Sequence, residues 1–458
     1  MVPAEFPDRT VCVIGLGYVG LTLAVAMAHA GFEVHGVEIR DDVLERLGRG
    51  RPHFHEPGLE EGLRRAVEGG LSFSKYIPPG GDARVYIITV GTPLDADGRT
   101  RLDMVENVSR ELSGHLKDGD LVIIRSTVML GTTRQVALPI LRRAGVRFDI
   151  AFCPERTLEG KALEELHQLP QIIGGASIDA VVRASQIFGF LTPTIVRVSR
   201  LETAEMIKLI DNTSRDVHFA FANEVARLCD AAGISAAEVI RAGGLAYPRT
   251  NVSLPGPVGG PCLGKDPYIL AEGLRALGVD PELSLAARRL NERQAEEVAA
   301  HLARVTAALP GFPARPVVTL MGLAFKGRPA TDDLRGTTAR PILEACRRHI
   351  PSARFRGYDA VVRESEIRDF GLEPCVSLED AFAGSNLVLV LNNHPVFADM
   401  PVERLADRLA RPGLIYDFWN NFDARELRLP EGTGYMALGA HGVARMPAAA
   451  APADEAAS

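Results

Sequence analysis

One cysteine of this chain lies in a loop suited to nucleophilic chemistry. Cys262 belongs to residues 258–266 (VGGPCLGKD), where glycine and proline exclude regular structure and let the backbone bend around a ligand. Lys265 follows three residues later, and a nearby cation favours the thiolate form of a thiol. Asp266, four residues after the cysteine, is a candidate base. The loop therefore predicts a reactive thiol at Cys262.

The other five cysteines lie in apolar strand or helix patterns, which are typical of cysteines packed in a core. They are Cys12, Cys153, Cys229, Cys346 and Cys375. The chain has no CxxC pair and no His/Asp/Cys spacing typical of a metal site, so we expect neither a disulfide framework nor a metal.

A long helical pattern carries a second set of candidate residues. Apolar residues recur with a period of 3.6 over residues 201–233, which predicts a helix that ends at Gly233. Lys208 and Asn212 are four residues apart and project from one face, where they can donate hydrogen bonds to an oxyanion. The alternative is a lysine on a solvated face, and the spacing alone favours that alternative.

The first glycine motif is typical of a dinucleotide site. Its residues are Gly15, Leu16, Gly17, Tyr18, Val19 and Gly20. The three glycines permit a tight turn, close approach of a pyrophosphate, and close packing of a helix on a strand. Glu38 ends the next apolar strand, and its carboxylate suits a ribose diol and repels a 2′-phosphate. We therefore expect NAD as the cofactor.

Two threonines follow apolar strands further along the chain. Thr92 and Thr127 end the runs at residues 85–93 and 121–128. Ligands of an open parallel sheet bind at the carboxyl ends of its strands, so both threonines are candidates to face the cofactor or substrate. A threonine that only satisfies a local turn is an equally good interpretation of the spacing.

The elements that must position these residues alternate between strands and helices in two stretches, 8–198 and 317–440. In the first, apolar runs predict buried parallel strands at 11–17, 33–39, 85–93, 121–128 and 148–155. In the second, the runs are at 317–327, 354–360, 387–394 and 414–420. The residues between the two stretches predict helices, including a capping box at Ser235 and Glu238 and a helix over 283–309, around the glycine-rich loop 243–267. These patterns predict an α/β chain: a Rossmann-type doubly wound sheet, a central all-helical part and a second Rossmann-like domain.

Composition limits the classes of partner. The 458 residues are too many for one hydrophobic core, and the balance of 46% apolar and 24% charged residues is that of a globular protein. The net charge of -7 argues against nucleic acid or an anionic membrane as the main partner. The start lacks the pattern of a signal peptide and no run approaches the length of a membrane helix, so we expect a cytoplasmic protein.

Taken in order, the motifs resemble those of the UDP-glucose/GDP-mannose dehydrogenase family. They are GLGYVG, VGTP, STV, CPER, AEMIKLIDN, GGPCLGKD and AFKGRPATDDLRG, and the resemblance extends from Val11 to about Trp419. It implies a four-electron oxidation of a sugar C6 alcohol to a carboxylate, with two NAD molecules used in turn. In that scheme Cys262 adds to the aldehyde as a thiohemiacetal, the second oxidation gives a thioester, and water hydrolyses it.

The resemblance also implies the roles of single residues. Lys208 and Asn212 would stabilise oxyanionic intermediates, and Asp266 would activate water or assist proton transfer. Glu155 would be the family's active-site glutamate, and Thr127 would hold a water. The implied NAD contacts are Gly15, Gly17, Tyr18, Val19, Gly20, Glu38, Thr92 and Thr127. The implied substrate contacts are Glu155, Arg156, Lys208, Asn212, Arg249, Gly259, Lys326 and Arg335.

Three of the implied substrate residues have further consequences. Lys326 and Arg335 would meet phosphate or sugar oxygens, and the alternative is a surface ion cluster with the neighbouring acids. Arg249 resembles a residue that reaches the substrate from a neighbouring subunit, which requires a homodimer. The implied domains are NAD-binding (1–198), central helical and dimerising with the cysteine loop (199–309), UDP-sugar-binding α/β (310–445) and a disordered tail (446–458).

The substrate expected from the resemblance is a UDP-N-acetylhexosamine. The residues after CPER, at 159–161, 164–166 and 172–175, resemble the branch that oxidises these sugars. Pro261 departs from the histidine usual in that branch, and Lys265 agrees with the UDP-glucose branch. We therefore expect UDP-N-acetylmannosamine or UDP-N-acetylglucosamine, with UDP-glucose as the alternative.

Two other classes of protein share part of these features. A two-electron hydroxyacid dehydrogenase has no need of a loop cysteine or a third α/β domain, and this chain has both. A non-catalytic sugar-nucleotide sensor would be expected to lose Cys262, Lys208 or Asp266, and this chain keeps all three.

Overall fold

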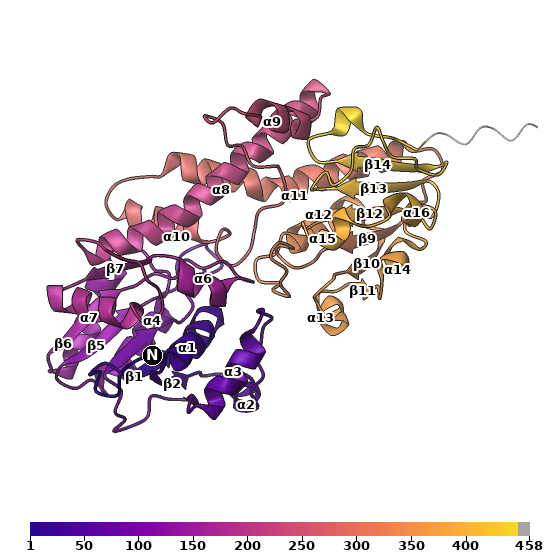
Figure 1. The fold of residues 1–458 in the computed structure, drawn as a ribbon. Coiled ribbons are helices and arrows are strands. Elements are labelled where there is room, and N and C mark those ends of the chain that lie inside the picture. The colour runs from indigo at the N-terminus through magenta and orange to yellow at the C-terminus, as the bar shows by residue number, and fades with distance from the viewer. Residues whose placement is uncertain (448–458) are drawn as a thin grey trace, which may run out of the picture. The chain divides into compact units, whose positions relative to one another are not determined.

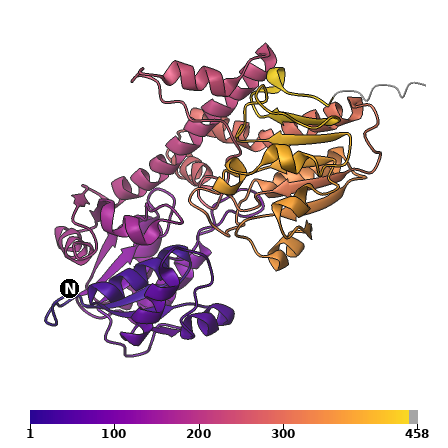
Figure 2. The same ribbon diagram turned by 45° about the vertical axis from the view of Figure 1, so that its right-hand side comes forward.

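The computed structural model describes residues 1–447, so most of the predicted tail at 446–458 lies outside the described residues. The chain forms two compact units. The first comprises residues 1–213 and 265–282, and the second comprises residues 214–264 and the chain from 283 onward. The predicted central helical segment is thus shared between them, and the chain passes from one unit to the other three times. Figures 1 and 2 show the elements of both units.

The first unit contains an eight-stranded sheet in the order β3-β2-β1-β4-β5-β6-β7-β8. Its strands are β1 (Thr10–Ile14), β2 (Glu33–Val37), β3 (Ser72–Ser74), β4 (Val85–Ile88), β5 (Asp120–Ile124), β6 (Phe148–Phe152), β7 (Gln171–Gly175) and β8 (Ile195–Arg197). Every pair is parallel except the β6–β7 pair, which is antiparallel. The five predicted strands and the doubly wound order are confirmed, because β1 and β4 lie side by side where the strand order reverses. The other three strands, β3, β7 and β8, were not predicted.

Helices cover both faces of this sheet, as expected where parallel strands are joined by crossover connections (Figure 1). They are α1 (Tyr18–Ala30), α2 (Asp41–Gly48), α3 (Leu59–Glu68), α4 (Asp103–Ser113), α5 (Leu138–Leu141), α6 (Ala162–Gln168) and α7 (Ile178–Phe188). Helix α1 is buried from Gly20 to Met27, which fixes the glycine motif before it against the sheet.

The predicted long helix is α8 (Leu201–Ala232), and it ends before Gly233, whose φ of 72° favours glycine. Its first turns belong to the first unit. Glu205 there accepts hydrogen bonds from the backbone N–H groups of Gly131 (2.6 Å) and Thr133 (2.9 Å). These bonds set the helix on the sheet domain and so fix the residues that follow on α8.

Helix α10 (Asp266–Arg275) is a correction to the sequence analysis, which did not predict a helix at these residues. It packs on α8 in the first unit through Ile269 and Leu270, which form a buried cluster with Leu209. Proline in its first turn suits a helix start, because the amide nitrogen there has no helical partner. The glycine-rich loop therefore ends in a helix that begins at Asp266.

The second unit contains a six-stranded sheet in the order β11-β10-β9-β12-β13-β14, all parallel. Its strands are β9 (Val317–Met321), β10 (Arg354–Tyr358), β11 (Glu373–Pro374), β12 (Leu387–Val390), β13 (Gly413–Asp417) and β14 (Thr433–Ala437). The predicted second Rossmann-like sheet is confirmed, and β11 and β14 add one strand at each edge.

The helices of the second unit include two expected from the sequence, α9 (Ala236–Gly244) and α11 (Glu282–Ala308). The Ser235 hydroxyl caps α9 by accepting from the Glu238 N–H at 3.3 Å. The remaining helices are α12 (Ala339–His349), α13 (Glu364–Asp369), α14 (Leu378–Phe382), α15 (Pro395–Ala398) and α16 (Val402–Ala406).

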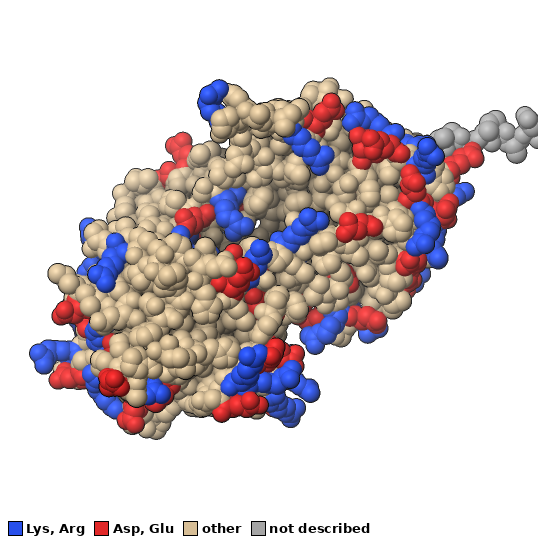
Figure 3. All heavy atoms as spheres, viewed as in Figure 1, with Lys and Arg blue, Asp and Glu red and all other residues tan. Residues whose placement is uncertain are grey.

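Charged side chains of both signs are intermingled on the face shown in Figure 3. This distribution agrees with a chain whose acidic and basic residues nearly balance, with a net charge of -7. Within residues 1–447, no helix combines the length and the apolar character that a membrane crossing requires.

Candidate active site

The glycine motif forms a turn that a dinucleotide phosphate can approach closely. Gly15 has a φ of 93°, which favours glycine, and Gly17 precedes α1 with nothing within 4 Å of a hypothetical Cβ. A Cβ at Gly20 would lie 1.9 Å from the Gly15 carbonyl oxygen, so the third glycine lets α1 pack against the turn. The open backbone at Gly17 and the start of α1 fit a pyrophosphate.

Glu38 lies directly after β2 and is buried beside this turn. Its carboxylate accepts hydrogen bonds from the N–H groups of Leu16 (3.2 Å) and Arg40 (3.0 Å). A carboxylate can accept about four hydrogen bonds, so these two leave capacity for a ribose diol. The predicted NAD-selective acid thus lies next to the glycine motif.

Tyr18 and Val19 are half-buried at the start of α1. The Tyr18 hydroxyl donates to the buried Glu56, whose carboxylate also accepts from the N–H groups of Gly160 (2.7 Å) and Ala162 (2.7 Å). Burial, followed by the Glu56 carboxylate, raises the pKa of Tyr18. Sequence reasoning missed Glu56, which ties the glycine turn to the loop after β6.

The two threonines lie after neighbouring strands, Thr92 beyond β4 and Thr127 beyond β5. The Thr92 hydroxyl donates to the Thr127 carbonyl oxygen. This bond spans 35 residues of the chain, so the local-turn interpretation does not account for the Thr92 hydroxyl. The same bond joins the two strand ends at the edge where ligands of such sheets bind.

Glu155 is buried and held as a carboxylate. Arg125 donates to its Oε2, and the N–H groups of Arg156 and Thr157 donate to its Oε1 at 2.7 Å each. Burial alone raises the pKa of Glu155, but Arg125, the Thr157 N–H and Lys208 outweigh it, and the pKa lies below its ordinary value. Glu155 therefore fits an acceptor and a source of negative charge better than a proton donor.

Arg125 is a residue that the sequence analysis missed. Its guanidinium is buried and also donates to the Cys153 carbonyl (3.0 Å) and the Gln171 side chain (2.8 Å). An arginine within the predicted buried strand at 121–128 was the available signal, because a buried charge needs a partner.

Lys208, Asn212 and Asp266 are all buried in the first unit. The Asn212 amide donates to Asp266 Oδ2 at 2.5 Å, and the Lys265 ammonium lies 3.0 Å from Asp266 Oδ1. Asp266 opens α10, where the helix dipole favours a negative charge. Burial of Lys208 argues against the solvated-face alternative, and its charge acts on Glu155. Lys208 lies one helical turn before Asn212, and we refer to Lys208, Asn212 and Asp266 together as the polar group of the first unit.

Cys262 is exposed, and the other five cysteines are buried, as predicted. In the second unit, the Gly260 N–H donates to the Gly336 carbonyl at 2.7 Å, and a Cβ at Gly260 would lie 2.4 Å from the Phe325 ring. A Cβ at Gly259 would lie 2.6 Å from the same Gly336 carbonyl oxygen. The loop therefore needs its two glycines for close backbone packing, and it presents the thiol outward.

The remaining predicted substrate residues are placed as follows in their own units. Arg156 is half-buried, with one nitrogen 3.2 Å from Asp211 Oδ2. Arg249 is exposed and stacks on Tyr247 at 4.6 Å. Lys326 is half-buried with its ammonium 5.2 Å from the centre of the Phe325 ring.

Arg335 is exposed and pairs with Asp333 through two short bonds, 2.9 and 2.6 Å, which is the ion cluster given as the alternative.

Each predicted site residue belongs to one of the two units. The first unit contains the glycine motif, Glu38, both threonines, Glu155, Arg156, Lys208, Asn212 and Asp266. The second contains Cys262, Arg249, Gly259, Lys326 and Arg335. Among residues 1–447, no group of three or more histidine, cysteine or carboxylate side chains is arranged to hold a metal ion.

Three models of one protein family match the chain between residues 9 and 424. The NAD binding domain matches residues 9–192, the central domain residues 202–293 and the UDP binding domain residues 319–424. This chain belongs to the UDP-glucose/GDP-mannose dehydrogenase family. It is therefore a nucleotide-sugar dehydrogenase, an oxidoreductase whose first domain binds NAD.

Other members of the family are similar over nearly the whole chain. A UDP-N-acetyl-D-mannosamine dehydrogenase of Pyrococcus horikoshii is 33% identical over 86% of this chain and 92% of its own. A solved UDP-D-ManNAc dehydrogenase from Pyrococcus horikoshii has a TM-score of 0.83 and 31% identity, covering 95% of this chain and 100% of its own. A solved UDP-glucose dehydrogenase from Pyrobaculum islandicum also has a TM-score of 0.83, with 27% identity, covering 96% and 99%.

Proposed function

We propose that this chain oxidises the C6 hydroxyl of a UDP-N-acetylhexosamine, either UDP-N-acetylmannosamine or UDP-N-acetylglucosamine, to the uronic acid. The observation that carries the proposal is the exposed thiol of Cys262 in a chain whose other cysteines are buried. NAD, when bound, accepts one hydride in each of two oxidations. The similarity to UDP-N-acetyl-D-mannosamine dehydrogenases supports this class of sugar.

The thiol allows an alcohol to become an acid in two hydride transfers. The first removes a hydride from C6 and a proton from its hydroxyl, which leaves an aldehyde. Cys262 adds to the aldehyde carbon, and the thiol proton ends on the oxygen of the thiohemiacetal. Loss of a second hydride and of the hydroxyl proton gives a thioester, which water cleaves to the carboxylate and free thiol. One alcohol, two NAD and one water thus yield one carboxylate, two NADH and three protons.

The polar group of the first unit supplies the charges that this chemistry needs. In the proposed mechanism, Lys208 and Asn212 donate hydrogen bonds to the C6 oxygen whenever it carries negative charge. Asp266 holds the Asn212 amide at 2.5 Å and accepts a proton from water during thioester cleavage. Glu155, kept ionised by Arg125, takes part as a hydrogen-bond acceptor, and Thr127 holds a water.

We also propose that the chain is a homodimer formed through α8 and α9. In the second unit these helices and the loop after them expose large apolar side chains, and an apolar face of this kind marks a protein interface. The side chains are Phe221, Leu228, Ile234, Val239, Leu245, Tyr247 and Leu254. In the dimer, Arg249 would contact the substrate of the partner subunit. Among residues 1–447 the six cysteines form no disulfide, which fits a cytoplasmic enzyme, and its uronic acid product fits polysaccharide biosynthesis.

The decisive experiment is a panel of UDP-sugars with purified protein and NAD. We expect two NADH per sugar with UDP-N-acetylmannosamine or UDP-N-acetylglucosamine, and no acid from the Cys262→Ala variant. One NADH per sugar would indicate a two-electron dehydrogenase, and none across the panel would indicate a sensor. Normal acid yield from Cys262→Ala would exclude the covalent mechanism.

UDP-glucose is the second candidate substrate, favoured by two observations. The solved UDP-glucose dehydrogenase has the same TM-score as the UDP-D-ManNAc dehydrogenase. Near the thiol, Pro261 departs from the histidine usual in the N-acetylhexosamine branch, and Lys265 agrees with the UDP-glucose branch. The same panel decides between the sugars, because the preferred substrate is the one with the highest kcat/KM.

A further inference from the structure

We propose that Arg288 is a positioning residue that holds the Cys262 loop in its reactive conformation. Arg288 lies on α11, is 2% exposed, and its guanidinium faces the loop within the second unit. The inference rests on the proposed function, because it assigns Arg288 a purpose through the thiol. It also goes beyond that function, since Arg288 touches none of the reacting atoms.

The guanidinium brackets the segment that carries the thiol. One nitrogen donates to the Leu263 carbonyl at 3.0 Å, and the other terminal nitrogen donates to the Val258 carbonyl at 3.0 Å. The chain between these two carbonyls contains Cys262. Because a guanidinium is planar and rigid, two such bonds fix the distance between the ends of the segment.

A network behind Arg288 fixes the guanidinium itself. Asp216 accepts from Arg288 at 2.8 Å and from the Asn291 amide at 3.0 Å. Asn291 in turn accepts from Asn223, which exchanges two hydrogen bonds with Gly256, at 3.0 and 2.9 Å. The same network therefore holds both the start of the loop and its end.

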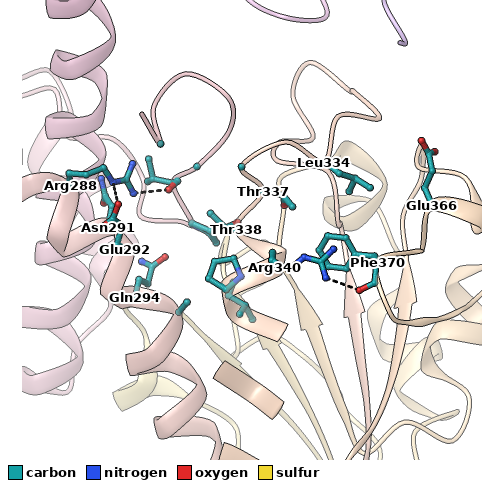
Figure 4. A pocket seen from close by; sticks show the side chains of 18 of the residues that line it. Arg288, Asn291, Glu292, Gln294, Leu334, Thr337, Thr338, Arg340, Glu366 and Phe370 are labelled. Atoms are coloured by element: carbon teal, nitrogen blue, oxygen red, sulfur yellow. Dashed lines mark hydrogen bonds and ion pairs between the residues drawn. The ribbon is translucent and has the colours of Figure 1, made fainter. Parts of the chain in front are cut away.

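Packing alone does not hold this side of the loop. A pocket of about 680 Å³ opens beside it, lined by loop residues, by Arg288 and Asn291 of α11, and by Thr337 and Thr338 before α12 (Figure 4). Figure 4 shows the Arg288 side chain reaching from α11 to the loop backbone at the edge of this pocket. Where side chains do not fill the space behind a loop, hydrogen bonds from a fixed donor must define its position.

The arrangement is also poorly explained as a device for stability. A buried ion pair is often replaced by apolar residues with no loss of stability, because desolvation of the two charges offsets their attraction. Arg288 and Asp216 are both buried and join α11 to α8. Positioning of the nucleophile gives this pair a purpose that stability alone does not.

The test compares Arg288→Lys with Arg289→Lys, which changes the exposed neighbour on α11. Lysine keeps the charge beside Asp216 but cannot donate to both carbonyls in a fixed plane. For Arg288→Lys we expect kcat for acid formation to fall about 100-fold, with KM for the UDP-sugar within about threefold. Because the first oxidation needs no thiol, the aldehyde trapped by hydroxylamine per NADH should rise.

Two measurements without substrate separate the inference from the proposed function. Hydrogen exchange at the Gly260 N–H should be at least about tenfold faster in Arg288→Lys, because the loop opens more often. The rate at which iodoacetamide alkylates Cys262 should depend differently on pH in Arg288→Lys and in wild type. Peptide mapping across pH 6–10 measures this. If wild-type protein oxidises no UDP-sugar, the proposed function fails, and these two measurements still decide the positioning by Arg288.

The inference would be overturned if Arg288→Lys had the same loop exchange rate, the same alkylation profile and the same kcat as wild type. If that variant does not fold, Asp216→Asn takes its place, since it removes the carboxylate that orients Arg288 and keeps the side-chain shape. We then expect kcat to fall about tenfold, measured at a temperature well below a lowered Tm, because removing one partner of a buried ion pair destabilises the fold. Unchanged kcat and loop exchange in Asp216→Asn would equally overturn it.

Discussion

Asp266 makes two contacts, and a substitution can remove its negative charge while keeping an oxygen that accepts a hydrogen bond. Its carboxylate accepts from Asn212 at 2.5 Å and lies 3.0 Å from the Lys265 ammonium. Asparagine at this position keeps an oxygen for Asn212 but removes the negative charge that accepts a proton in the proposed hydrolysis. The chemistry and the local structure can therefore be tested apart.

For Asp266→Asn we expect kcat to fall about 100-fold or more, with KM for the UDP-sugar little changed, because the lost contribution is that of a general base. Steady-state kinetics of acid formation measure this. The matched control is Asp280→Asn, which removes a carboxylate paired with Arg275 at the surface of the same unit. A kcat for Asp266→Asn within threefold of wild type would contradict the assigned role.

The amino-acid sequence predicted some site residues better than others. Cys262 was predictable because glycine and proline around it leave no core for a thiol to fill. Burial of Lys208 was not predictable, since helical spacing gives a face but not its neighbours. Arg125 and Arg288 were missed because each acts through partners distant in the chain, Glu155 for the first and Asp216 for the second.

At the scale of elements, the turn between β1 and α1 offers two glycines with different physical tasks. A Cβ at Gly17 meets nothing within 4 Å, whereas a Cβ at Gly20 would lie 1.9 Å from the Gly15 carbonyl oxygen. Substitution of the first therefore changes the space left for the cofactor, and substitution of the second changes the packing of the fold.

We expect Gly17→Ala to keep its Tm and to raise the Kd for NAD at least about tenfold, because the methyl group occupies the space of the pyrophosphate. Gly20→Ala should lose about 1–3 kcal/mol of stability, since backbone must shift to relieve the clash. Calorimetric titration with NAD and thermal unfolding measure the pair. Equal losses of stability in both variants would contradict this division.

The C-terminal segment after β14 contacts α8 through a half-buried histidine. His441 lies 3.2 Å from Asp230 of α8 and stacks on His301 of α11 at 4.1 Å. Burial and His301 lower the pKa of His441 to about 3, while burial raises the pKa of Asp230 to about 6. The two shifts have opposite effects on stability.

Because the folded state keeps His441 neutral, it binds fewer protons than the unfolded chain between about pH 6.5 and 3, and stability from His441 is lost as pH falls. Relative to wild type, we expect the free energy of unfolding of His441→Gln to rise by up to about 1.4 kcal/mol for each pH unit below 6.5. Urea unfolding at pH 7, 6 and 5 measures this. For Asp230→Asn we expect the opposite trend: its free energy of unfolding should fall relative to that of wild type as the pH falls through 6. A trend of the same sign in both variants would refute the assignment.

Elements were predicted where their apolar pattern was complete. The strands in the middle of each sheet are mainly apolar and almost fully buried, and all of them were predicted. Strands β3 and β11 were not, because they are short and lie at the sheet edges with little burial. Helix α10 was missed because the glycine-rich stretch before it obscured the helix start at Asp266.

At the scale of the whole molecule, the apolar side chains exposed on α8 and α9 bear on assembly. Leu228 on α8 and Leu277 after α10 are each 64% exposed, but only Leu228 belongs to the apolar group proposed as the dimer interface. The two leucines therefore form a matched pair for mutation.

We expect Leu228→Glu to convert a dimer to a monomer at micromolar concentration, because two carboxylates would face each other across a symmetric interface. Leu277→Glu should leave the assembly intact. Sedimentation velocity of both variants and of wild type measures this. A dimeric Leu228→Glu, or a monomeric wild type, would contradict the interface.

The order of the motifs gave the family and the two sheets, but not the way the chain divides between its units. Contiguous segments were the natural expectation for domains. The structure instead returns residues 265–282 to the first unit, where α10 packs on Leu209. No local pattern encodes such a return, because it depends on contacts between residues far apart in the chain.

This threading means that a single cut cannot yield either half of the enzyme. A fragment of residues 1–213 would lack α10. Leu209 would then be exposed to solvent, and the Asn212 amide would lose Asp266, its hydrogen-bond acceptor. To express the NAD-binding half alone, residues 265–282 would have to be spliced back after residue 213 through a short linker. A protease that nicks the loop before Cys262 would, for the same reason, leave two pieces that still hold each other.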